Sequence, residues 1–142
     1  MRALLDVNVL VALLDSNHVH HGRARAWLES HAAAGWASCP LTQNGCTRLL
    51  SQPRYPNALA TSVAMERLRG ATSHPSHAFW PADLSFLDPR IIVREHVHGP
   101  AQITDLYLLA LAVHHEGRLA TFDGKIPVSA VRGASAAQLV VI

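Results

Sequence analysis

The chain has 142 residues, of which 49% are hydrophobic and 15% charged, and its formal net charge is +2. This length and composition are typical of one globular domain and exclude a disordered protein. The small net charge permits a nucleic-acid partner, but the sequence lacks the basic stripe that a dedicated nucleic-acid binder usually shows. We therefore predict a single domain over residues 1–142 with a core of its own.

The cysteines and the N-terminus indicate the compartment. Cys39 and Cys46 have neither the number nor the spacing of a disulfide framework or a zinc site, so we expect two reduced thiols. The first apolar run is interrupted by Asp6 and does not have the layout of a signal peptide. No apolar stretch approaches the roughly 18 residues that a membrane-spanning helix needs. These features predict a soluble, cytoplasmic protein.

Short apolar runs that favour strands alternate with longer runs of helical spacing. Asn8 and Thr42 are expected to cap the helices that they precede or open, and Gly117 to end the last one. Residues 83–97 are ambiguous between a helical turn and a loop. The alternation predicts an α/β domain of three layers, with helices on both faces of a mainly parallel central sheet. In chain order we expect a strand at 3–5, helices at 9–14 and 18–34, a strand at 36–39, helices at 42–51 and 58–71, a strand at 78–80, a helix at 103–115, and strands at 119–122 and 138–142.

Three aspartates lie where apolar segments meet polar ones: Asp6 and Asp123 follow predicted strands, and Asp105 opens the apolar part of a helix. Ligand sites of open α/β sheets lie at such strand ends. Two carboxylates about 4 Å apart repel by about 4 kcal/mol at an effective dielectric of about 20, so converging aspartates would need a proton or a cation among them. Such a site would suit Mg²⁺ or Mn²⁺ and metal-assisted phosphoryl chemistry. Separate aspartates, acting as helix caps and turn formers, are the alternative.

Several segments together resemble a known family. LLDVNVLVAL at 4–13, ITDLYLLALA at 103–112 and LATFD at 119–123 look like the PIN-domain family, and more narrowly like the VapC-type toxins of bacterial type II toxin–antitoxin pairs. HVHH at 18–21 and PLTQNG at 40–45 are similar to one branch of these toxins. The resemblance extends from end to end, and the order and spacing of the first three segments carry it.

The resemblance implies a PIN-like three-layer α/β/α fold and a Mg²⁺- or Mn²⁺-dependent endoribonuclease that cleaves RNA and arrests growth. It also implies a cognate antitoxin that covers the acidic site, and a homodimer. By the match, Asp6, Asp105 and Asp123 would be the catalytic residues and metal ligands. Asn8 and Thr121 would be polar neighbours that orient a ligand or a water.

One departure from the family pattern matters for the site. A glutamate is usual three residues after a threonine in the helix that follows the second strand, and counting from Thr42 this position holds Gly45. We therefore expect three carboxylates, one well-held metal ion, and a weaker or absent second ion. Asn44 is a candidate for an additional oxygen ligand.

The histidines at 18–21 and the pair His114–His115 could suggest zinc. Zinc sites need defined spacings and usually other strong ligands, and adjacent histidines on a helix point in different directions. We interpret the first group as a polar helix start and the pair as a helix end, where positive charge is favourable.

Two other functions compete with the nuclease. A degenerate PIN domain would bind RNA or a protein partner without cleavage, as Gly45 suggests. A phosphohydrolase or receiver-like domain would be phosphorylated on Asp6 and would need a lysine at a later strand end. Lys125 is the only lysine in the chain, and it lies just past Asp123. The sequence specifies neither the RNA nor the antitoxin.

Overall fold

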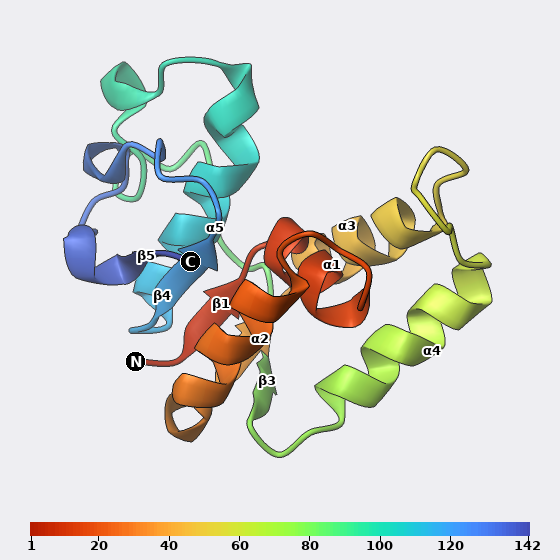
Figure 1. The fold of residues 1–142 in the computed structure, drawn as a ribbon. Helices are drawn as coiled ribbons and strands as arrows, with labels where there is room; N and C mark the ends of the chain where they lie inside the picture. The colour runs from red at the N-terminus through yellow and green to blue at the C-terminus, as the bar shows by residue number, and fades with distance from the viewer.

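Five short strands form one sheet at the centre of the molecule, as the computed structural model of residues 1–142 shows (Figure 1). The spatial order is β3-β2-β1-β4-β5, and each neighbouring pair is parallel. The predicted parallel sheet is therefore confirmed, and all five strands end at the same edge. The strands are β1 (Ala3–Leu5), β2 (Trp36–Ser38), β3 (His77–Phe79), β4 (Arg118–Thr121) and β5 (Leu139–Val141).

The helices cover both faces of the sheet, which confirms the three-layer architecture. Leu4 and Leu119 point into a core cluster with α5, whereas Leu5 and Ala120 belong to a second cluster with α1, α2, α3 and α4. This alternation follows from the two-residue period of a strand, which directs successive side chains to opposite faces. The helices are α1 (Val7–Leu14), α2 (His21–Ser30), α3 (Pro40–Ser51), α4 (Thr61–Thr72) and α5 (Ile103–His114), with short 3₁₀ helices at 32–34, 94–96, 100–102, 128–130 and 136–138.

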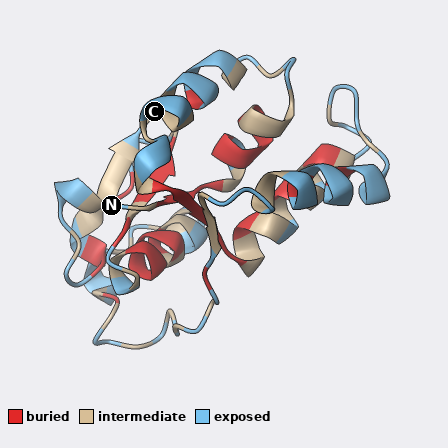
Figure 2. Ribbon diagram, turned by 90° about the horizontal axis from the view of Figure 1, so that it is seen from below, coloured by how far each residue is buried: buried red, intermediate tan, exposed pale blue.

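The helix α5 is central, as its apolar sequence predicts. Leu106, Leu108, Leu109 and Leu111 are fully buried. Figure 2 shows the buried residues in the three central strands and in parts of the helices, whereas the edge strands β3 and β5 contain none. Judged by length and hydropathy, the structure contains no helix that could span a lipid bilayer.

Two predicted helix caps are wrong, in each case because the helix begins earlier. Asp6, not Asn8, caps α1: its Oδ1 accepts a hydrogen bond from the backbone N–H of Val7 at 2.7 Å. The helix α3 begins at Pro40, because proline is well suited to the first helical position. Thr42 then lies inside the first turn, where its hydroxyl accepts a hydrogen bond from the N–H of Cys39 at 3.0 Å.

Other element boundaries differ from the prediction by a few residues. The expected helix at 18–34 is shortened to α2 and followed by a 3₁₀ turn, because residues 15–20 form turns in which Asp15 Oδ1 accepts from the N–H of Asn17 at 3.0 Å. The helix α4 begins three residues later than expected, at Thr61. The preceding residues do not join the helix, because the N–H of Leu59 donates to the carbonyl of Leu50 at 2.9 Å. Residues 83–87 contain no helix, so the helical turn considered there is absent.

The end of α5 is a Schellman-type turn. The N–H of Gly117 donates to the carbonyl of Ala112 at 2.8 Å, and that of Glu116 donates to Val113 at 3.0 Å. Glu116, not Gly117, takes the left-handed conformation, with φ 54°. Gly117 is needed for another reason: a Cβ atom there would lie 2.6 Å from the Arg2 carbonyl oxygen and 2.6 Å from Cη2 of Trp80.

This crowding makes Gly117 sensitive to substitution. We expect Gly117→Ala to lower the free energy of unfolding, by roughly 1–3 kcal/mol as for other overpacked positions, because the backbone of Arg2 cannot move aside without disturbing β1. The matched control is Gly70→Ala in α4, where a Cβ atom meets nothing within 4 Å. That variant should be more stable by about 0.4–1 kcal/mol. Urea denaturation of both variants measures the difference, and a neutral Gly117→Ala would contradict the packing argument.

Candidate functional site: an acidic cluster at the β1–β4 edge

The candidate site lies between β1 and β4, where the order in which the chain adds strands to the sheet reverses. The chain adds β2 and β3 on one side of β1, and then returns to add β4 and β5 on the other. Ligands of open α/β sheets bind at such a switch point, outside the carboxyl ends of the strands. Asp6 directly follows β1, Asp123 lies two residues past β4, and Asp105 lies in the first turn of α5.

Hydrogen bonds join the ends of β1 and β4. The Thr121 hydroxyl donates to Oδ2 of Asp6 at 2.8 Å and accepts from the N–H of Asp123 at 3.1 Å. The N–H of Asp6 donates to the carbonyl of Ala120 at 3.0 Å, and Oδ1 accepts from Val7. Asp6 is only 7% exposed, so its carboxylate is held in one orientation by groups on both sides.

The three carboxyl groups influence one another electrostatically. Burial raises the pKa of Asp6, although hydrogen bonds from Thr121 and Val7 oppose this shift, and the charge of Asp123 raises the pKa further. Burial, followed by the charges of Asp6 and Asp123, raises the pKa of Asp105 from 3.8 to about 6. The structure therefore brings together three acids that come from separate parts of the sequence.

No basic side chain neutralises this cluster. The ion pairs of the chain join Arg25 to Glu29, Arg69 to Glu66, Arg90 to Asp88, and Arg94 to Glu95, all on the surface. Clustered carboxylates without a counter-ion repel one another, and a bound divalent cation commonly neutralises this repulsion.

The donor set fits a hard cation such as Mg²⁺ or Mn²⁺, because it consists of oxygen atoms alone. The ligand oxygens of the three acids do not all lie within 4.8 Å of one another. Mg²⁺ usually binds through one or two carboxylates and keeps several waters. Asp123 is exposed, so its side chain has room to approach an ion directly or to bind it through water.

The other predicted site residues lie at the margin of the cluster. Asn8 is exposed on the first turn of α1, next to Val7. Asn44 is exposed on α3 and lines a groove of about 380 Å³ together with Gly45, Arg48 and other residues. The groove is also lined by Val7 and Thr104, the chain neighbours of Asp6 and Asp105, so it opens beside the acids. Lys125 is exposed, and its backbone N–H donates to Oδ1 of Asp123 at 2.8 Å.

The absence of a glutamate at position 45 has a structural explanation. A Cβ atom on Gly45 would lie 2.7 Å from Cγ2 and 3.3 Å from Cγ1 of Val7. The side chain of Val7 therefore occupies the space that a larger residue at position 45 would need. Sequence reasoning missed this role of Val7, because nothing in the sequence pairs the first turn of α1 with the middle of α3.

Other candidates for chemistry or base stacking belong to the core. Trp36 and Trp80 are 6% and 7% exposed, so neither presents a face on which RNA bases could stack. Cys46 is fully buried, and burial raises the pKa of its thiol to about 12. The thiol is therefore protonated at neutral pH and is not a nucleophile.

Comparison with known proteins agrees with the fold. The family model of the PIN domain matches residues 3–131, and the chain belongs to the PIN-domain family. Its relatives make it a VapC-type member. Ribonuclease VapC44 of Mycobacterium tuberculosis is 54% identical over 135 residues, which cover 95% of each chain. Ribonuclease VapC39 of the same organism is 40% identical over 134 residues, covering 94% of this chain and 96% of the relative.

Two solved structures share the fold at low sequence identity. VapC20 of Mycobacterium tuberculosis, described as a Sarcin-Ricin loop cleaving toxin, has a TM-score of 0.64 at 12% identity and covers 94% of this chain and 96% of its own. VapBC2 of Rickettsia felis, bound to a DNA fragment from its promoter, has a TM-score of 0.63 at 14% identity. The match covers 100% of this chain and 98% of the VapBC2 chain. At these identities, the likeness shows the fold alone.

The raised pKa of Asp105 predicts a characteristic pH dependence of stability. The folded chain binds the Asp105 proton more tightly than the unfolded chain does. This proton therefore contributes fully to the free energy of unfolding below about pH 4, and the contribution is lost as the pH rises through about 6. The change from 3.8 to about 6 corresponds to about 3 kcal/mol, and solvent screening of this half-exposed group reduces it to about 1 kcal/mol.

In metal-free buffer, Asp105→Asn should therefore be more stable than the parent by about 1 kcal/mol at neutral pH and equally stable near pH 4. Thermal unfolding in the presence of a chelator measures this difference. Asp88→Asn is the control, because Asp88 pairs with Arg90 on the surface and should show no such gain. A pH-independent difference for Asp105→Asn would argue against the electrostatic origin.

Proposed function

We propose that this chain is a metal-dependent endoribonuclease and the toxin of a bacterial type II toxin–antitoxin pair. As a VapC-type PIN domain it is a ribonuclease, an enzyme that acts on RNA phosphodiester bonds. The finer assignment is that Asp6, Asp105 and Asp123 hold Mg²⁺ or Mn²⁺. The observation that carries it is the cluster of acids without any basic partner at the switch point of the sheet.

The three aspartates would have different roles in metal binding, because their environments differ. Asp6 is buried and held by Val7 and Thr121, so it would be the fixed ligand that sets the position of the ion. Asp105, whose pKa is raised by burial and by the neighbouring acids, would release its proton when the cation binds. Asp123, on an exposed turn, would adjust to a substrate phosphate or to a water. The bound ion would supply a water of lowered pKa and stabilise the leaving oxygen.

The groove beside Gly45 is the proposed path of the RNA strand. Arg48 lies on its wall and presents a guanidinium that can bind a phosphate oxygen in a bidentate manner. Asn44 lies on the same wall and offers a hydrogen-bonding amide. Arg48 would also offset part of the repulsion between the acids and the phosphates.

The proposed partners follow from the site and from the family. A cognate antitoxin would cover the acidic cluster, and the VapBC2 complex of Rickettsia felis is a family precedent for such a pair on promoter DNA. We further propose a homodimer that acts on cytoplasmic RNA. Which RNA is cut depends on surface shape rather than on the acids.

The first test is cleavage of total bacterial RNA by the purified chain with Mg²⁺, with Mn²⁺ and with a chelator. We expect metal-dependent cleavage that Thr121→Val lowers by about 10–100-fold, as is typical for residues that orient a ligand, and that Asp6→Asn lowers further. Asparagine is as good a helix cap as aspartate, so Asp6→Asn should keep α1 intact.

Asp88→Asn is the matched control for this assay, since it removes a partly buried carboxylate outside the acidic cluster that is paired with Arg90. It should cleave at the parental rate. Cleavage by Asp6→Asn at the parental rate, with a circular dichroism spectrum equal to that of the parent, would refute the proposed ligand role.

A second candidate function is a PIN domain that binds RNA without cutting it, which Gly45 favours. In that case, a fourth acid should create activity. We expect Gly45→Glu alone to destabilise the chain, because its Cβ atom would lie 2.7 Å from Cγ2 of Val7. The double variant Val7→Ala with Gly45→Glu removes the obstructing methyl groups.

We expect the double variant to be more stable than Gly45→Glu alone and to bind a second metal ion. Thermal unfolding and calorimetric titration with Mn²⁺ measure the two effects. Metal-dependent cleavage by the parental chain would exclude the binding-only function, whereas cleavage by the double variant alone would support it.

A further inference from the structure

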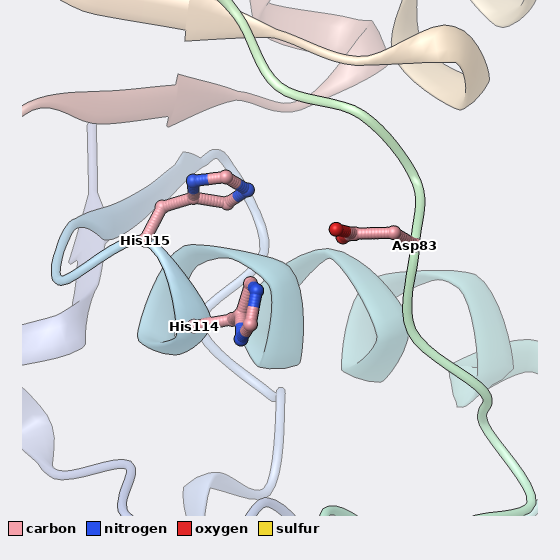
Figure 3. Close-up of side chains that lie close together, drawn as sticks. All are labelled: Asp83, His114 and His115. Carbon is pink, nitrogen blue, oxygen red and sulfur yellow. The ribbon is translucent and has the colours of Figure 1, made fainter.

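A second group of metal-ligating side chains lies away from the acidic cluster. Asp83, His114 and His115 each offer one ligand atom, and these atoms all lie within 4.8 Å of one another. Figure 3 shows the two imidazoles at the end of α5 and the carboxylate of Asp83 directed toward them from the neighbouring segment. The expectation that adjacent histidines point in different directions is wrong here. Their ring centroids are 5.1 Å apart, and the rings meet edge to face.

The position of His115 is fixed by the fold. Its ring stacks on Trp80 with centroids 4.5 Å apart and an interplanar angle of 10°. Trp80 is itself buried, and its backbone N–H donates to the carbonyl of Ser38 at 2.9 Å, which anchors it beside the end of β2. Asp83 follows only three residues later, so the anchored Trp80 brings its chain segment close to His115.

His115 has a polar atom that the chain leaves unsatisfied. Its Nε2 is buried and has no hydrogen-bond partner. A buried polar atom without a partner is energetically unfavourable, and such an atom requires an explanation. Burial lowers the pKa of His115, the charge of His114 lowers it further, and the charge of Asp83 raises it. A neutral imidazole is the form that binds a metal ion.

We propose that Asp83, His114 and His115 form a binding site for a transition-metal ion of the Zn²⁺ type. Two imidazoles and one carboxylate favour zinc over Mg²⁺, which prefers oxygen ligands alone. Ligand atoms in a tetrahedral zinc site with bonds of about 2.0–2.2 Å lie roughly 3.3–3.6 Å apart. His114 and Asp83 are exposed and can close this distance toward the fixed His115. Water would fill the fourth position.

The bound ion would join two segments that are distant in the sequence. Asp83 lies in the extended stretch after Trp80, and the histidines lie at the end of α5. The ion would therefore fasten this stretch to the core. The site is separate from the acidic cluster, because Asp105 and His114 are nine residues apart on α5, which corresponds to roughly 14 Å along the helix axis.

The test is calorimetric titration of the full chain with Zn²⁺ in the presence of excess Mg²⁺, so that Mg²⁺ competes for any site made of oxygen ligands alone. We expect one zinc ion per chain, with affinity lowered at least about 10–100-fold in His114→Gln and in Asp83→Asn. Both residues are exposed, so the variants should fold. His98→Gln is the matched control, since it removes another exposed histidine from outside the group, and it should bind zinc like the parent.

A second measurement does not depend on any variant. Paramagnetic Co²⁺ added to the parental chain should broaden the ring NMR signals of His114 and His115 before those of the other histidines. Absence of zinc binding by the parent, binding that is equal in all three variants, or broadening that begins at other histidines would each overturn the proposal. Neither measurement uses RNA cleavage, so its outcome is independent of the proposed nuclease function.

Discussion

The parallel pairing of β1 with β4 is the constraint on which the site depends. Leu4 lies opposite Leu119 and Leu5 opposite Ala120, so both strands end at the same level. Only in this register does the Thr121 hydroxyl reach Asp6, and a slip by one residue would turn Thr121 to the other face of the sheet. Both strands are buried, so the hydrophobic core on each face enforces the register.

The acidic cluster opposes folding, and the rest of the structure compensates for it. Asp6 is buried with a raised pKa, and Asp105 shares its electrostatic environment. Hydrogen bonds from Thr121 and Val7 offset part of the cost, and the apolar helix α5 supplies the burial that keeps the arrangement in place. Sites that bind ligands often carry such a cost in stability. A cation would remove the repulsion, and binding would then stabilise the fold.

Close approach between elements shapes the surroundings of both sites. Gly45 lets α3 approach Val7, and Gly117 lets the end of α5 approach Arg2 and Trp80. In the first case the contact fills the space that a fourth acid would require. In the second, it brings Trp80 against His115 and so places the proposed zinc ligands. Each of these two glycines therefore permits a close packing contact beside one of the two proposed sites.

The sequence by itself determined the alternation of strands and helices and the central place of α5, because these depend on local hydrophobic periodicity. It also marked Asp6, Asp105 and Asp123 as unusual, because carboxylates at the ends of apolar segments have no role in packing. The first residues of α1, α3 and α4 were displaced from the prediction, because caps and turns there depend on hydrogen bonds such as that of Leu59 to Leu50.

Only the tertiary structure decided the electrostatic coupling of the three acids, the filling of the Gly45 position by Val7, and the meeting of Asp83 with His114 and His115. Each of these joins residues that are far apart along the chain. Their distance is set by sheet order and helix packing, which no local pattern of residues encodes.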